Sequence, residues 1–168
     1  MSRWSSALLL LALVGCGDPE VEDALGDGLE RVEVTDTCTT GIQWSKGVDG
    51  SPNMLPGANC LDCHQGGIQP NLEVAGTVFA ASGDQDGCAG VEGVTVEITD
   101  VAGDVFTFKT NAAGNFYGLA LGIEPPYRAM LRYQGRERPM NFEVTDLACN
   151  RCHAQVGVDG APGRIEAP

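Results

Sequence analysis

Residues 94–110 read VTVEITDVAGDVFTFKT, and two alternating stretches of this segment flank the turn residues Gly103 and Asp104. Before the turn, apolar residues at positions 94, 96 and 98 alternate with Thr and Glu, and after it Phe106 and Phe108 alternate with Thr and Lys. A repeat of two places successive side chains on opposite faces of a strand. The segment therefore predicts two half-buried strands separated by a turn.

The same period of two extends outward from this segment in both directions. It covers residues 74–79 and 127–134 and continues at Phe142 and Val144, with turns such as Gly114-Asn115 and Gln134-Gly135 between the stretches. Short strands at this spacing are typical of a β-sandwich or a small barrel. The flanking segments are rich in glycine and proline, so we expect irregular structure there, with one helical turn at a motif described below.

A set of residues in this middle region matches a known pattern: GVTV at 93–96, TNAAGNF at 110–116, then Leu119, Gly122 and Tyr127. The pattern resembles the carboxypeptidase-regulatory-like domain and covers residues 72–146. The resemblance implies a mainly β fold, a transthyretin-like (prealbumin-like) Greek-key β-sandwich, in which Gly114 suits a tight turn and Phe116 re-enters the core. Such domains usually act as scaffolds or adhesion modules, so the resemblance implies a fold and no activity.

Two short motifs flank the predicted strands. Residues 59–65 read NCLDCHQ and residues 148–154 read ACNRCHA, and the two histidines of the chain, His64 and His153, each directly follow a Cys-x-x-Cys pair. On one helical turn such cysteines share a face, and the histidine lies beside them. This spacing is the attachment signature of c-type haem. The sequence therefore predicts two c-type haems, attached through Cys60, Cys63, Cys149 and Cys152, with His64 and His153 as proximal iron ligands.

Other chemistry can use the same cysteines. Two Cys-x-x-Cys pairs can form a tetrahedral zinc site, redox-active dithiols or structural disulfides. Closed zinc sites rarely need a histidine directly after the second cysteine, and redox dithiols normally open a helix in an α/β fold. Haem is therefore the main hypothesis. The alternative is a non-catalytic envelope binding or adhesion module whose ends hold zinc or disulfides.

The sixth iron ligand cannot be a further histidine of this chain, which has only two. Methionine is another common ligand, and Met54 and Met140 precede the two motifs by a few residues; packing in a core is the other role open to them. Histidine–methionine ligation suits electron transfer, whereas an open position suits a haem peroxidase or a gas sensor. Arg151 and Arg164 are candidate partners for haem propionates, or solvated surface residues.

The N-terminus predicts export and a lipid anchor. The apolar run at residues 7–14 is too short to span a bilayer, and Leu13-Val14-Gly15-Cys16 resembles a bacterial lipoprotein box. We expect a signal peptide at residues 1–15, lipidation of Cys16 and an acidic tether at residues 16–36. Because Gly17 is not acidic, the outer membrane of a Gram-negative cell envelope is favoured over the inner membrane.

Charge and the remaining cysteines restrict the partners and the compartment. The formal net charge of -13 argues against nucleic acid and favours a basic redox partner protein. Cys38 and Cys88 remain after the motifs and Cys16 are assigned, and in an exported protein such a pair predicts a disulfide worth about 4 kcal/mol. Independent reduced thiols are the alternative.

Together these features define an expected organisation. Residues 37–71 form a first haem segment, residues 72–146 the sandwich, and residues 147–168 a second haem segment and tail. The overall layout resembles a group of cytochrome-type lipoproteins of Gram-negative bacteria. We expect a membrane-anchored dihaem c-type cytochrome that relays single electrons in the cell envelope, an electron carrier rather than an enzyme. If the two ends of the sandwich lie together, the haems are neighbours.

Overall fold

The computed structural model describes residues 51–65, 67–88 and 90–168. The predicted signal peptide, Cys16, the tether and Cys38 lie outside these residues. Within them the elements are α1 (Cys60–His64), β1 (Val74–Phe79), β2 (Thr95–Thr99), β3 (Val105–Lys109), β4 (Asn115–Gly118), β5 (Arg128–Tyr133), β6 (Arg136–Pro139), α2 (Cys149–Cys152) and β7 (Ile165–Glu166). No helix of the described part has the length and apolarity that crossing a bilayer requires.

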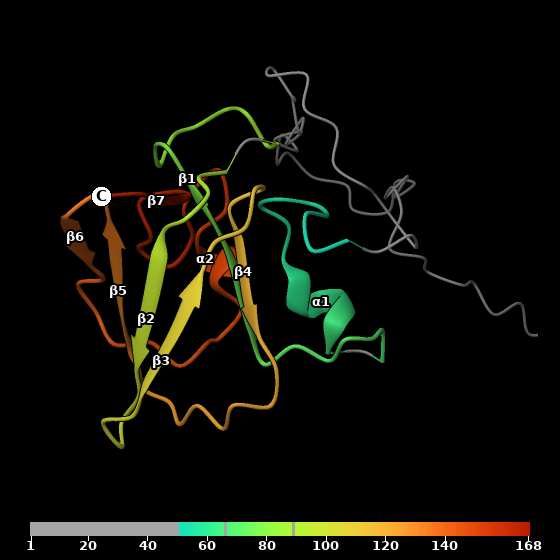
Figure 1. Cartoon of the computed structure of the whole chain (residues 1–168), viewed down its shortest axis with the longest axis vertical. Coiled ribbons are helices and arrows are strands. Elements are labelled where there is room, and N and C mark those ends of the chain that lie inside the picture. The colour runs from blue at the N-terminus through green and yellow to red at the C-terminus, as the bar shows by residue number, and fades with distance from the viewer. Residues whose placement is uncertain (1–50, 66, 89) are drawn as a thin grey trace, which may run out of the picture.

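The strands of the described residues pair into two sheets (Figure 1). One sheet has the order β3-β2-β5-β6 and is antiparallel throughout. The other has the order β4-β1-β7, in which β1 is antiparallel to β4 and parallel to β7. The protein is therefore mainly β, as predicted, and its two sheets form a sandwich.

The main core lies between the sheets. Val74 and Val78 of β1 join Val96 and Ile98 of β2 in one cluster, and each of these side chains is at most 2 % exposed. Their spacing of two puts them on the same face of each strand. Burial of a valine or isoleucine side chain contributes about 1.5–3 kcal/mol, so the alternation in the sequence directly supplies the stability of the sandwich.

The second face of β1 is also buried. It carries Ala75, Thr77 and Phe79, each at most 2 % exposed. Both α1 and α2 contact β1, and Leu61 of α1 joins Ala75 in a second, smaller apolar cluster. Figure 1 shows α1 (teal) beyond β4, on the side away from β5 and β6. The helical turns thus form a partial third layer over the sheet β4-β1-β7.

The strand predictions hold for β1, β2, β3 and β5 and fail elsewhere. Phe142 does not continue the strand pattern; it is 73 % exposed, and only Val144 forms an isolated bridge, to Tyr127. Strands β4, β6 and β7 are too short for a period of two to be visible in the sequence. The tail is an ordered wrap, because β7 pairs with β1.

The expected turn at Gly114 is confirmed. Gly114 has a φ of 78°, in the region that favours glycine. A side chain there would also meet the carbonyl oxygen of Val78 at 2.5 Å. The next residues enter β4, where Phe116 is only 3 % exposed, so the aromatic ring returns to the core as predicted.

Candidate functional site

Each Cys-x-x-Cys-His motif forms one turn of helix, as predicted. Helix α1 spans Cys60–His64 and α2 spans Cys149–Cys152, with His153 at its end. The first cysteine of each motif makes the same contact: its thiol donates a hydrogen bond to the carbonyl oxygen two residues earlier. Cys60 donates to Ala58 at 3.6 Å, and Cys149 donates to Leu147 at 3.8 Å. The two motifs therefore share one local geometry.

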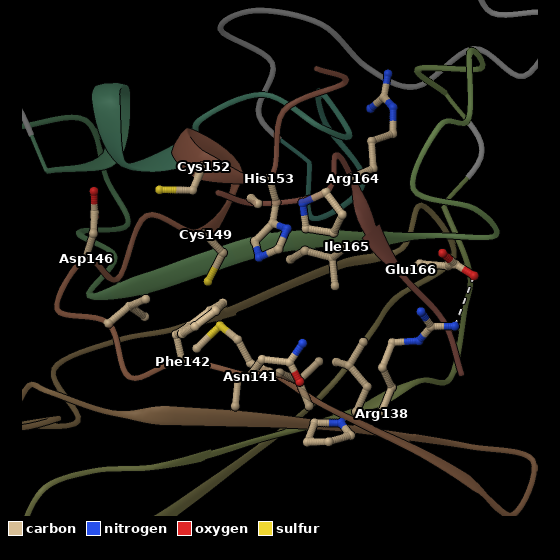
Figure 2. Close-up of a pocket in the computed structure, with 18 of the residues that line it drawn as sticks. Arg138, Asn141, Phe142, Asp146, Cys149, Cys152, His153, Arg164, Ile165 and Glu166 are labelled. Carbon is tan, nitrogen blue, oxygen red and sulfur yellow. Dashed lines mark hydrogen bonds and ion pairs between the residues drawn. The ribbon is translucent and has the colours of Figure 1, made fainter. Parts of the chain in front are cut away.

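The second motif borders a large cavity. This cavity has a volume of about 630 Å³ and opens between α2, β5, β7 and the chain that follows β6. Cys149, Cys152, His153 and Met140 all line it. Figure 2 shows Cys149 and His153 pointing into the hollow and facing Phe142 and Asn141 across it. Cofactor sites commonly measure about 300–1,000 Å³, so this cavity has the size of one.

The His153 ring has a fixed tautomer. Its Nδ1 lies 2.9 Å from the carbonyl oxygen of Gly163. A carbonyl oxygen only accepts hydrogen bonds, so Nδ1 carries a proton, and in the neutral ring Nε2 keeps its lone pair. Gly163 is itself held in place, because the N–H of the next residue, Arg164, donates to the Ser82 carbonyl oxygen at 2.9 Å. The backbones pack so closely here that a side chain at position 163 would meet the same oxygen at 2.4 Å. Metal-binding histidines usually have this arrangement.

Both thiols of the second motif have raised pKa values. Burial raises the pKa of Cys149 to about 12, although an interaction with the Tyr127 hydroxyl opposes the shift. The Tyr127 hydroxyl donates its proton to the carbonyl oxygen of Asp146 at 2.7 Å. Burial, followed by the nearby Asp159, raises the pKa of Cys152 as well. Redox-active dithiols need a lowered pKa, so these thiols lack the property on which thioredoxin-like chemistry depends.

The first motif has the same histidine arrangement beside a smaller cavity. Nδ1 of His64 lies 2.9 Å from the carbonyl oxygen of Pro70, so its Nε2 also keeps the lone pair. Cys60, His64 and Met54 line a cavity of about 230 Å³. Burial raises the pKa of the Cys60 thiol. The described residues thus place one cysteine, one histidine and one methionine beside this smaller cavity.

Two of the described cysteines are disulfide-bonded. They are Cys63, which the sequence assigns to the first haem, and Cys88, which it assigns to a disulfide with Cys38. Cys38 lies outside the described residues. Cys60, Cys149 and Cys152 carry unbonded thiols. A thioether at Cys63 therefore requires that its disulfide first be reduced to the thiol.

The two motifs lie next to each other. Asp62 of the first and Arg151 of the second, each located between the cysteines of its motif, form an ion pair at 3.7 Å. Leu61 and Ala148 belong to one apolar cluster. Phe116 lines both cavities, and its ring carbons lie only 2.7 Å from where a side chain on Gly76 would begin. The two sites therefore share a wall, and the expectation that the ends of the sandwich lie together is met for the motifs.

The arginines differ from expectation. Arg164 is 3 % exposed, and its guanidinium lies 4.1 Å from the centre of the Phe79 ring, with Nε donating to the Asp84 carbonyl oxygen at 2.9 Å. Arg164 also lines the larger cavity, and Figure 2 shows its side chain extending away from His153. Its role as a propionate partner stays a prediction. Sequence reasoning missed Arg138, which lines the cavity and pairs with Glu166 at 3.0 Å. Its position two residues before Met140 was the available signal.

The residues beside the larger cavity fit a covalently held haem, because two unbonded cysteines, a histidine and a methionine line one space. Among the residues that the structure describes, no three His, Cys, Asp or Glu side chains converge as a metal cluster. Beside the larger cavity the donors are a Cys pair, one histidine and one methionine. Beside the smaller cavity they are Cys60, His64 and Met54, because Cys63 is disulfide-bonded. Comparison with protein-family models, with curated proteins and with solved structures gives no match for the chain. Functional inference therefore rests on the site itself.

Proposed function

We propose that the chain is a c-type cytochrome that carries two haems and relays single electrons in the cell envelope. The observation that carries this proposal is the matching pair of histidines. In each motif the histidine has Nδ1 bonded to a backbone carbonyl oxygen, at 2.9 Å in both cases, and Nε2 left with its lone pair. Metal-binding histidines usually have this arrangement, because the bonded Nδ1 orients the ring and leaves Nε2 for the metal.

Each side chain has a defined task in this proposal. Cys149 and Cys152 would hold one haem through thioethers, and His153 would bind its iron. Met140 lines the same cavity and is the candidate for the sixth position. Cys60, Cys63, His64 and Met54 would serve the first haem in the same way once the disulfide at Cys63 is reduced. When bound, the haem iron supplies one-electron exchange between its ferric and ferrous forms.

The remaining expectations belong to the same proposal. The sandwich is of the transthyretin-like Greek-key type, lipidated at Cys16 and attached to the outer membrane of a Gram-negative bacterium. The acidic chain, with a net charge of -13, docks on a basic redox partner. The surface of the larger cavity is mostly apolar, and an apolar site with methionine ligation favours a raised potential.

The decisive experiment is expression of the full chain together with c-type haem maturation proteins. We expect a red protein whose reduced spectrum has c-type bands and whose intact mass after denaturation includes two haems. A colourless chain with stoichiometric zinc contradicts the proposal and favours the binding module. Rapid carbon monoxide binding to the ferrous protein identifies an open sixth position and favours the sensor or peroxidase.

A further inference from the structure

A chain of buried hydrogen bonds begins inside the second motif, at Asn150. This residue lies between Cys149 and Cys152 and is only 5 % exposed. Its side-chain N–H groups donate to the carbonyl oxygen of Ala58 at 2.8 Å and to the Thr77 hydroxyl at 3.0 Å. Its oxygen accepts from the backbone N–H of Thr77 at 3.0 Å. One side chain of α2 thus holds β1 and the residues just before α1.

Thr77 and Asn115 extend the chain of bonds. The Thr77 hydroxyl donates to the side-chain oxygen of Asn115 at 2.8 Å and accepts from the backbone N–H of Gly57 at 2.9 Å. The Asn115 amide then donates to the carbonyl oxygen of Met54 at 2.9 Å. Thr77 is 0 % exposed and Asn115 is 5 % exposed, so water does not compete for these bonds.

The three side chains come from three separate elements and hold one segment. Asn150 on α2, Thr77 on β1 and Asn115 on β4 bind backbone groups of residues 54–58. Met54 and Asn115 also line the first cavity. Because a buried polar group left without a partner is costly, the bonds form or break together. The position of Met54 therefore depends on the position of α2.

We infer that Asn115, Thr77 and Asn150 are positioning residues that couple the two haem sites. The inference rests on the proposed function. Thioethers at both ends of α2 would hold Asn150 between them, so a haem at the second site would fix the position of Asn150. The hydrogen bonds through Thr77 and Asn115 would then fix the backbone position of Met54. A haem at the second site thereby favours methionine ligation at the first, and coupling of this kind is reciprocal.

The first test needs no haem signal. Amide hydrogen exchange is measured on the full chain as purified, in the wild type and in Thr77→Val, which keeps the side-chain shape but removes the hydroxyl. We expect exchange in the peptide that contains Gly57 to accelerate by about tenfold or more, because the N–H loses its acceptor. Thr77→Ser keeps the hydroxyl and should restore slow exchange. Val94→Ala, a buried apolar change outside the chain of bonds, is the matched control for general loss of stability.

The second test is a double-mutant cycle on the haem-loaded protein. Cys149→Ala with Cys152→Ala removes the second haem, and we expect the methionine charge-transfer band of the remaining haem to weaken. Asn150→Ala should weaken that band in the dihaem protein. Combining Asn150→Ala with the two cysteine changes should weaken the band no more than the cysteine changes do alone. Additive losses, or unchanged exchange at Gly57 in Thr77→Val, overturn the inference while the proposed function stands. A wild-type chain without haem overturns the proposed function, and the coupling with it.

Discussion

The two motifs are alike within one helical turn and different beyond it. In both motifs the first thiol donates a hydrogen bond to the carbonyl oxygen two residues earlier. In both, Nδ1 of the histidine is hydrogen-bonded to a backbone carbonyl oxygen. The cavity beside the second motif measures about 630 Å³, whereas that beside the first measures about 230 Å³. Five consecutive residues thus set the donor atoms that each motif offers, and the tertiary structure sets the space beside them.

The larger cavity exists because the second motif reaches the gap between the sheets. Cys149 packs against the main core, and its cavity includes Val96 and Ile98 of β2. The first motif lies on the outer face of β1, where Cys60 packs against the smaller cluster around Leu61. We therefore expect the second site to be the drier one and its haem to have the higher potential.

The largest expected effect separates the two sites completely. Cys149→Ala with Cys152→Ala should reduce the covalently bound haem from two to one, because both thioethers of one haem are lost. Cys60→Ala with Cys63→Ala is the matched variant for the other site. Intact mass and the haem content per chain measure the result. Redox titration should show a higher potential for the haem that remains at Cys149 and Cys152 in the Cys60→Ala, Cys63→Ala variant. Equal potentials in the two variants would contradict the comparison.

A glycine under the second site gives the next effect. A methyl group on Gly76 would lie 2.7 Å from ring carbons of Phe116 and 3.0 Å from Cβ of Cys149. Gly76→Ala should therefore lower the free energy of unfolding by about 1–3 kcal/mol and reduce haem attachment at the second motif. Urea unfolding and intact mass check both. Gly83→Ala, at a position with nothing within 4 Å, is the control and should change neither quantity strongly.

The pH dependence of the haem-free chain gives a smaller effect. Burial raises the pKa of Cys149 from its ordinary value of 9.0 to about 12. Between these values the unfolded chain releases the thiol proton and the folded chain keeps it, so stability is full below pH 9.0 and falls as pH rises. The expected loss is up to about 1.4 kcal/mol per pH unit.

Urea unfolding across this pH range measures that slope. Cys149→Ser should remove most of it, because serine does not titrate there. The haem-loaded protein should also lack the Cys149 contribution, because a thioether has no proton to lose. The same slope in Cys149→Ser and in the wild type would show that the pKa of the Cys149 thiol is not raised in the folded chain.

The smallest effect concerns the ion pair between the motifs. Asp62 and Arg151 have side chains that are 67 % and 54 % exposed, so solvent screens their attraction. Asp62→Asn should change the free energy of unfolding by less than about 1 kcal/mol. Thermal unfolding at low and high salt checks this, and any difference should disappear at high salt. A larger, salt-independent loss would mean that the pair is an important link between the sites.

The sequence was sufficient for features that depend on neighbouring residues. Period-two alternation located β1, β2, β3 and β5, and the motif spacing located both helical turns. Met54 and Met140 were proposed from spacing alone, and each lies beside the cavity of its own motif. These features have periods or spacings of a few residues, so they are visible without any tertiary information.

Features that depend on distant residues were not visible. The carbonyl oxygen of Gly163, the position of Arg138 and the bonds of Asn150 are set by contacts between segments far apart in the chain. Arg164 looked like a surface residue because its stacking on Phe79 has no sequence signature. Phe142 looked like part of a strand because its alternation is genuine, although the backbone there does not pair.

The placement of Phe116 has a consequence for redesign. One ring borders both cavities, so enlarging or shrinking it alters two compartments with a single substitution. To change one cavity alone, substitutions have to be made at residues that line only that cavity. Met140 and Leu131 line only the larger cavity, and Leu72 lines only the smaller one. Random mutagenesis at position 116 should accordingly yield variants whose two cofactors change together.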